Sequence, residues 1–235
     1  MQIFLDSANC EEVKNWIRQG VLDGITTNPS IMFKDGVYDL EEGALNLCKL
    51  VGPDRPVSVE VTTNDPGEMV AQGLEFSRWS SNIVVKIPII NENGKSCLEA
   101  IKTLSADGIS VNCTAILSFN QAILAAKAGA RYLSIFAGRV ADEGNDPAVV
   151  IRNVRLWLDQ WSSESRIIVG SIRTTIDIQN AALAGAHIIT IPPQFLPKML
   201  DHKYTRETVR QFNEDAERAL AQIARANATS ASAGI

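Results

Sequence analysis

The stretch that decides the fold is Ile83-Val84-Val85-Lys86-Ile87-Pro88, a short run of mostly β-branched residues that ends at a proline. Its length and composition are typical of a buried strand in a parallel sheet. Segments with helical periodicity lie on both sides of it, at residues 66–78 and 97–106. This alternation predicts β-α units, in which each parallel strand is joined to the next by a helix.

The same alternation continues along most of the 235 residues. We expect eight strands, at residues 3–5, 24–26, 57–61, 83–87, 110–112, 132–136, 166–169 and 187–191. We expect helices at residues 11–18, 40–51, 66–78, 97–106, 120–128, 147–161, 175–184, 196–200 and 206–225. Capping residues agree with these limits, since Ser118 and Asp65 precede two of the helices while Gly129 and Gly185 each follow a helix.

Eight such units predict an α/β fold, a single (β/α)8 TIM barrel over residues 1–235, because such barrels typically have about 250 residues. The segment at about 206–225 would be an extra C-terminal helix, and 226–235 a flexible tail. An open doubly wound sheet is the alternative architecture. It usually carries a glycine-rich turn after its first strand, where this chain reads DSANC, so the barrel is favoured.

Composition excludes several classes of function. A net charge of −5 argues against binding nucleic acid, and no apolar run reaches the ~18 residues that cross a membrane. The N-terminal sequence lacks the features of a secretion signal, which favours a cytoplasmic protein. The four cysteines form no C-x-x-C pair and have no nearby histidine, so we expect reduced thiols and no metal site. Whether Cys113 is reactive or only a small buried residue stays open.

Lys86 is the most informative candidate for chemistry. Active sites of TIM barrels lie at the C-terminal ends of the strands, and this lysine falls within an apolar strand. Burial of a lysine favours the neutral amine, which can attack a carbonyl carbon and form a Schiff base. A structural lysine bonded to a carboxylate such as Glu60 is the alternative interpretation.

Carboxylates are the candidates for acid–base chemistry. The chain has only two histidines, His187 and His202, and neither closes a strand beside other polar residues. Asp6 and Glu60 do lie at or near strand ends, and carboxylates can carry proton transfer. The alternatives are that Asp6 caps the helix near Glu11 and that Glu60 only pairs with Lys86.

Two arginines follow the sixth and seventh strands, where many barrels bind phosphate. The Arg139 and Arg173 guanidinium groups, together with backbone N–H groups around Ser171, would suit a phosphorylated substrate. Each arginine taken alone would more often form a surface or interstrand salt bridge.

Eight ordered motifs carry a resemblance to a known family: FLDSAN, GITTNPS, VSVEV, VVKIP, GISVNCTAILSFNQA, AGARYLSIFAGRVADEG, GSIR and LAGAHIITIPP. Over nearly the whole chain, to about Asp215, the sequence resembles the transaldolase family, in the short-chain branch that includes fructose-6-phosphate aldolase. The resemblance implies a class I mechanism without a metal or organic cofactor. It implies that Lys86 forms the Schiff base and Asp6 transfers protons, while Glu60 and Thr114 hold a catalytic water.

The resemblance also implies binding roles. The hydroxyl groups of a dihydroxyacetone unit would be bound by Asn28, Asn112 and Ser134, with Thr26 nearby. The phosphate of the sugar would be bound by Arg139, Ser171 and Arg173. Partners would therefore be small sugar phosphates, and the family suggests a homo-oligomer such as a pentamer or decamer, with residues 206–225 packed on a neighbouring subunit.

Glu60 and Phe136 help to choose an activity within the resemblance. Aldolase-type members tend to have glutamine and tyrosine at these positions, so Glu60 and Phe136 favour transfer over simple aldol cleavage. The resemblance then implies a transaldolase of the pentose phosphate pathway. It would move dihydroxyacetone from fructose 6-phosphate or sedoheptulose 7-phosphate to an aldose phosphate. The alternatives are an aldolase that uses free dihydroxyacetone and a sugar-phosphate-binding barrel without catalysis. Departures such as Ile135, where many relatives have proline, and the NENGKS insert leave the donor, the acceptor and a role in a specialised pathway open.

Overall fold

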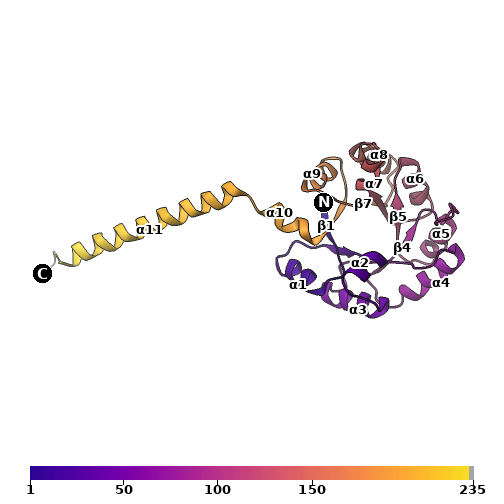
Figure 1. Ribbon diagram of the computed structural model, residues 1–235, viewed down its shortest axis with the longest axis horizontal. Helices are drawn as coiled ribbons and strands as arrows, with labels where there is room; N and C mark the ends of the chain where they lie inside the picture. Colours follow the sequence, from indigo (N-terminus) through magenta and orange to yellow (C-terminus); the bar gives the residue numbers. More distant parts are fainter. Residues whose placement is uncertain (233–235) are drawn as a thin grey trace. The chain divides into compact units, whose positions relative to one another are not determined.

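The computed structural model describes residues 1–232, and the chain divides into two compact units, Met1–Phe195 and a second that begins at Leu196. The first unit is a closed barrel of eight parallel strands in sequence order, surrounded by helices (Figure 1). The strands are β1 (Gln2–Asp6), β2 (Gly24–Thr26), β3 (Val57–Glu60), β4 (Ile83–Pro88), β5 (Val111–Ile116), β6 (Tyr132–Phe136), β7 (Arg166–Gly170) and β8 (Ile188–Ile191). The predicted (β/α)8 barrel is therefore confirmed, and the open sheet is excluded by the pairing of β1 with β8.

Helices connect the strands: α1 (Cys10–Arg18), α2 (Pro29–Lys34), α3 (Leu40–Val51), α4 (Pro66–Phe76), α5 (Leu98–Ala106), α6 (Phe119–Lys127), α7 (Ala137–Asp142), α8 (Pro147–Gln160) and α9 (Thr175–Leu183). The expected caps are present, since the Asp65 carboxylate accepts from two backbone N–H groups of α4 and Ser118 Oγ from one of α6. Gly129 and Gly185 have positive φ angles of 98° and 93° after α6 and α9. A short 3₁₀ helix, Pro193–Phe195, closes the first unit.

Two short helices were not predicted, and β5 is longer than expected. The helix α2 begins at Pro29, directly after Asn28 caps it. The helix α7 follows β6 without a side-chain cap and contains Gly138, so the usual start signals are missing. Strand β5 extends to Ile116, and its register with β6 shifts between Cys113 and Ile116.

The barrel interior is layered because alternate residues of each strand face inward. One layer is apolar and buried, and it consists of Phe4, Val84, Tyr132, Ile168 and Ile188. Two residues further along the same strands stand Asp6, Lys86, Ser134, Gly170 and Thr190. The interior of the barrel is therefore apolar in this layer and polar in the next layer toward the C-terminal ends of the strands.

The second unit contains α10 (Leu196–Leu200) and α11 (Lys203–Ser232). The helix α11 is longer than the expected segment 206–225, and residues 226–232 are helical although a frayed tail was expected there. The rest of that tail, 233–235, lies outside the described residues. The assignment of residues 1–235 to one domain stays a prediction. Over the part of the chain that the structure describes, no helix combines the length and hydrophobicity needed to cross a membrane.

Candidate active site

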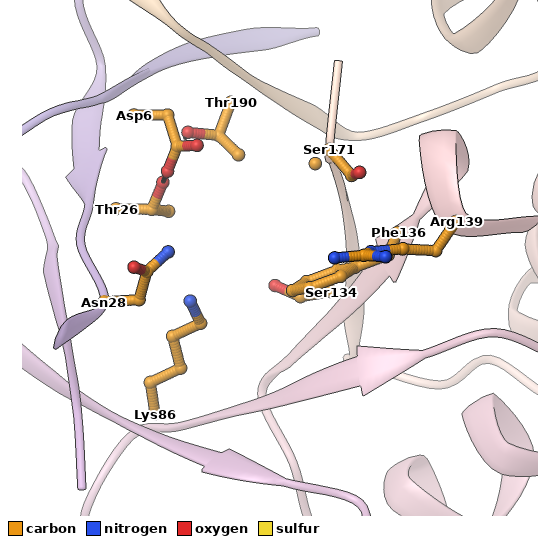
Figure 2. Close-up of a pocket in the computed structure, with 10 residues that line it drawn as sticks. Asp6, Thr26, Asn28, Lys86, Ser134, Phe136, Arg139, Ser171 and Thr190 are labelled. Carbon is orange, nitrogen blue, oxygen red and sulfur yellow. Dashed lines mark hydrogen bonds between the residues drawn. The ribbon is translucent and has the colours of Figure 1, made fainter. Parts of the chain in front are cut away.

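A cavity of about 200 Å³ opens at the C-terminal ends of the strands. It is lined by Asp6, Thr26, Asn28, Lys86, Ser134, Phe136, Arg139, Gly170, Ser171 and Thr190 (Figure 2). Eight of these ten residues belong to the set expected from the sequence. Six of the eight strands thus contribute to one small concave site, which is where barrels of this architecture place their chemistry.

Lys86 lies at the base of this cavity. The residue is only 4% exposed, and its side chain points from β4 toward the cavity (Figure 2). Its Nζ atom lies 3.0 Å from Glu60 Oε2 and donates a hydrogen bond of 3.1 Å to the Thr27 carbonyl oxygen. A buried amine in direct contact with a carboxylate has a partner with which it can exchange a proton during a reaction.

Asp6 lies at the end of β1, within reach of the same cavity. Thr26 Oγ1 donates a hydrogen bond of 2.6 Å to Asp6 Oδ1. Burial raises the pKa of Asp6; the charge of Lys86 and the Thr26 hydrogen bond act in the opposite direction, and Glu60 adds to the increase. The alternative role of Asp6 as a helix cap is wrong, because Asn9 Oδ1 accepts the N–H groups at the start of α1.

The amide groups of the site are held by hydrogen bonds that leave some of their atoms free. Asn28 Oδ1 accepts the Ile31 N–H at 2.9 Å, which leaves the Asn28 amide N–H groups for the cavity. Asn112 does not line the cavity itself. Its Nδ2 donates to Ser58 Oγ at 3.1 Å, and its Oδ1 accepts from Ser134 Oγ at 2.7 Å. Ser134 is therefore held in place by a buried network.

Thr114 is buried on β5, two residues beyond Asn112 and on the same face of the strand. Within residues 1–229, its Oγ1 is the buried side-chain oxygen or nitrogen that lacks any hydrogen-bond partner. Buried hydroxyl groups are nearly always paired, so this one calls for a partner outside the protein, and a bound water is the simplest.

Arg139 and Ser171 form the other side of the cavity, opposite Thr26 and Asn28 (Figure 2). Among the described residues, the Arg139 guanidinium has no hydrogen bond or ion pair. Ser171 has a φ angle of 58°, a strained conformation for a residue other than glycine. A free guanidinium beside a hydroxyl is suited to binding an anion.

Arg173 does not line the cavity. Its guanidinium forms a bidentate ion pair with the Asp142 carboxylate on α7, and this contact lowers the pKa of Asp142. Both side chains are about half exposed. The surface salt bridge that the sequence left open is thus present for Arg173, whereas Arg139 faces the cavity.

His187 and Cys113, which the sequence analysis also considered, lie in structural surroundings. His187 Nδ1 accepts the Ile167 N–H at 3.0 Å, and burial lowers the pKa of His187 to about 4. Cys113 is fully buried, and burial raises the pKa of its thiol well above the ordinary value. Neither lines the cavity.

Thr190 and Gly170 were missed by the sequence analysis. Thr190 is a polar residue in the apolar run of β8, the same signal that identified Lys86 in β4. Its distance of two residues from the inward-facing Ile188 would have placed it in the polar layer. Gly170 carries no side chain that could have been recognised.

Comparison with known proteins gives one consistent result. A family model described as Transaldolase/Fructose-6-phosphate aldolase matches residues 3–233. A "Probable transaldolase" of Dehalococcoides mccartyi is 39% identical over 215 residues, which cover 92% of this chain and 97% of that protein. A "Probable transaldolase 2" of Listeria monocytogenes is 41% identical over 217 residues, covering 92% and 96%. A "Probable transaldolase" of Clostridium botulinum is 40% identical over 222 residues, covering 94% and 99%.

The solved structures add support for the fold alone. A structure of a mandelate oxidase mutant superposes with a TM-score of 0.55 at 13% sequence identity. The superposition covers 81% of this chain and 63% of that chain. At this identity the likeness concerns the arrangement of the backbone.

Proposed function

The chain belongs to the transaldolase/fructose-6-phosphate aldolase family, and on this basis we propose that it is a class I transaldolase. It would transfer a dihydroxyacetone unit from a ketose phosphate, such as fructose 6-phosphate or sedoheptulose 7-phosphate, to an aldose phosphate. The observation that carries the proposal is Lys86, a buried amine whose Nζ is held at the base of the cavity beside Glu60.

The chemistry begins with attack of the neutral Lys86 amine on the ketose carbonyl carbon. Loss of water from the adduct gives a protonated Schiff base, which can accept an electron pair from the neighbouring carbon–carbon bond. Asp6 takes the proton from the hydroxyl group on the fourth carbon as the bond between the third and fourth carbons breaks. The aldose product leaves, and the three-carbon unit stays on Lys86 as an enamine.

The second half of the reaction reverses these steps with a new aldehyde. The enamine carbon attacks the aldehyde carbon of the acceptor, and Asp6 returns its proton to the oxygen that becomes a hydroxyl. Water then hydrolyses the Schiff base and frees the Lys86 amine. The raised pKa of Asp6 suits both tasks, because a carboxyl group that changes protonation state easily can serve as base and acid in turn.

Glu60 and Thr114 would hold the water that is released and later consumed. Glu60 Oε2 lies 3.0 Å from Lys86 Nζ, so a water beside both could exchange a proton with either. The unpaired Thr114 hydroxyl supports this role, since a bound water would satisfy it.

Substrate binding would divide between the two sides of the cavity. Asn28 and Ser134 would bind the hydroxyl groups of the dihydroxyacetone unit, with Thr26 beside Asp6. Asn112, which does not line the cavity, would contribute by holding Ser134. Arg139 and Ser171 would bind the phosphate. Arg173 is paired with Asp142 and does not line the cavity. We therefore propose that it assists phosphate binding from the edge of the site.

Phe136 favours transfer over simple aldol cleavage. It lines the cavity and has no hydroxyl group with which to protonate the enamine, so the intermediate would wait for an aldehyde. Incubation with fructose 6-phosphate, with and without erythrose 4-phosphate, tests this. We expect glyceraldehyde 3-phosphate and sedoheptulose 7-phosphate when the acceptor is present. Free dihydroxyacetone as the main product would instead identify an aldolase.

The cellular role is part of the same proposal. We place the enzyme in the cytoplasm and in the pentose phosphate pathway, where both donor sugars occur. The four free cysteines, three of them buried, suit a reducing compartment. Complementation of a transaldolase-deficient bacterium would test the pathway assignment.

We also propose that the protein is a homo-oligomer, with a pentamer or decamer as the expected size. The helix α11 has apolar residues at alternating spacings of three and four: Val209, Phe212, Ala216, Ala219 and Ile223. Its large apolar side chains are half or more exposed, among them Phe212 at 65%. Such a stripe is typical of a helix that packs against another helix. Size-exclusion chromatography with light scattering, repeated on Phe212→Glu, would measure the assembly.

A further inference from the structure

We infer that Thr190 is a positioning residue for the acid–base group Asp6 and that it acts through Thr26. The inference rests on the proposed function, because it concerns the residue that would move the proton. It assigns a task to a buried side chain of β8 that has no role in the mechanism described above.

The three side chains form a chain of hydrogen bonds along one wall of the cavity (Figure 2). Thr26 Oγ1 lies 2.6 Å from Asp6 Oδ1 and 2.5 Å from Thr190 Oγ1. The residues come from neighbouring strands, since β1 pairs with β2 on one side and with β8 on the other. Thr26 and Thr190 are both buried, at 2% and 5% exposure.

The direction of these hydrogen bonds follows from the number of protons available. An ionised carboxylate can only accept, so Thr26 must give its single hydroxyl proton to Asp6. The hydrogen bond between the two threonines must then be donated by Thr190. Both hydroxyl dipoles consequently point toward the carboxylate, and each strengthens the next.

The packing of Thr190 fixes the position of its hydroxyl oxygen. A Cβ atom added to Gly170 would lie 3.3 Å from Thr190 Cγ2, so the threonine methyl group rests against the bare glycine. A β-branched side chain has few rotamers, and a methyl group held on Gly170 leaves the hydroxyl toward Thr26. The absence of a side chain at Gly170 thus gives the Thr190 methyl group the space that directs its hydroxyl toward Thr26.

Two consequences for catalysis follow. Thr26, held by Thr190, binds Oδ1 of Asp6 and leaves Oδ2 for the substrate hydroxyl. The aligned dipoles also favour the ionised form of Asp6. Other charged groups act on it as well: Lys86 from β4 in the same sense, and Glu60 from β3 and Asp35 at the end of α2 in the opposite sense.

The test compares Thr190→Val, which keeps the shape but loses the hydroxyl, with Thr190→Ser, which keeps the hydroxyl. For Thr190→Val we expect kcat to fall about tenfold with KM nearly unchanged, because binding groups are intact. We also expect the acidic limb of the kcat/KM profile to move to higher pH by about half a unit. Thr190→Ser should restore both, and Lys86 should still be trapped by borohydride in each variant.

A double-mutant cycle separates an action through Thr26 from direct contact with substrate. In a Thr26→Val background, Thr190→Val should cause no further change in the pH profile. Equal effects of Thr190→Val in both backgrounds, or a wild-type pH profile for Thr190→Val, would overturn the inference alone. Absence of turnover by the wild-type enzyme would overturn the proposed function and this inference with it. If Thr190→Val does not fold, Thr190→Cys provides the same comparison with a weak donor.

Discussion

Gly138 gives a quantitative test of how the phosphate side of the cavity is built. A Cβ atom at this position would lie 2.4 Å from the Ser171 carbonyl oxygen, 2.7 Å from Arg173 Nε and 2.8 Å from Ser171 Oγ. An ordinary contact needs at least 3.4 Å, so Gly138→Ala must push α7 and the loop after β7 apart by about 1 Å. The backbone hydrogen bond from the Gly138 N–H to the Ser171 carbonyl oxygen, now 3.1 Å, would be lost or bent.

Two results are expected from this displacement. Overpacking of this kind typically lowers the free energy of unfolding by about 1–3 kcal/mol. A shift of about 1 Å in a substrate-binding group can lower activity by about 100-fold, so we expect kcat/KM for fructose 6-phosphate to fall by that order. Thermal unfolding and a coupled assay of glyceraldehyde 3-phosphate release measure the two effects.

Gly108→Ala is the matched control. Gly108 follows α5 with a φ angle of 79°, and an added Cβ would meet no atom within 4 Å. Alanine in this conformation lowers stability by about 1–2 kcal/mol without touching the cavity. Its kcat/KM should stay at the wild-type value. Wild-type kcat/KM for Gly138→Ala would refute the assignment of this contact to the phosphate site.

Three further predictions concern single groups. Asp6→Asn should abolish activity but raise the melting temperature near neutral pH. Burial raises the pKa of Asp6, so its ionised form lowers the stability of the fold. The gain in melting temperature should shrink in acid, where the wild-type carboxyl group is protonated. Thr114→Val should lower activity but change stability by less than about 1 kcal/mol, since the hydroxyl has no partner within the protein and would lose only its bond to water. Thr27→Val, which loses a hydrogen bond of 2.8 Å to the Ser58 carbonyl oxygen, should lower stability by about 1–2 kcal/mol. Burial lowers the pKa of His187 to about 4 in the folded protein, so as the pH falls the unfolded chain binds this proton first. The free energy of unfolding should therefore decline from about pH 6.5 toward pH 4. Denaturant titrations should show a smaller decline for His187→Asn.

The barrel could be predicted because its strands and helices have different periods in the sequence. Runs such as 83–88 and 166–169 are β-branched, and the long helices between them carry recognisable caps. The helix α7 escaped prediction because it has no capping side chain and includes a glycine that is required by a close backbone contact. A contact between segments distant in the sequence, such as the one at Gly138, leaves no pattern in the local sequence from which the helix could be predicted.

The candidate site was predictable to the extent that polar residues interrupt apolar strands. Lys86 and Asp6 were found in this way, Arg139 was found from its place after a strand end, and the family motifs supplied Asn28 and Ser134. The ion pair of Arg173 with Asp142 could not be found, because it joins a loop to an unpredicted helix. Thr190, like Lys86, is a polar residue within an apolar strand. Threonine is so common in strands, however, that this pattern does not identify it as a site residue.

The central claim is that Lys86 forms a Schiff base, and borohydride trapping tests it most directly. The protein is reduced with borohydride in the presence of fructose 6-phosphate, and intact mass and peptide mapping follow. We expect one dihydroxyacetone-sized adduct per chain, located on Lys86 and absent from Lys86→Ala. A wild-type protein that releases glyceraldehyde 3-phosphate from fructose 6-phosphate but forms no adduct, or forms it on another lysine, would contradict the account.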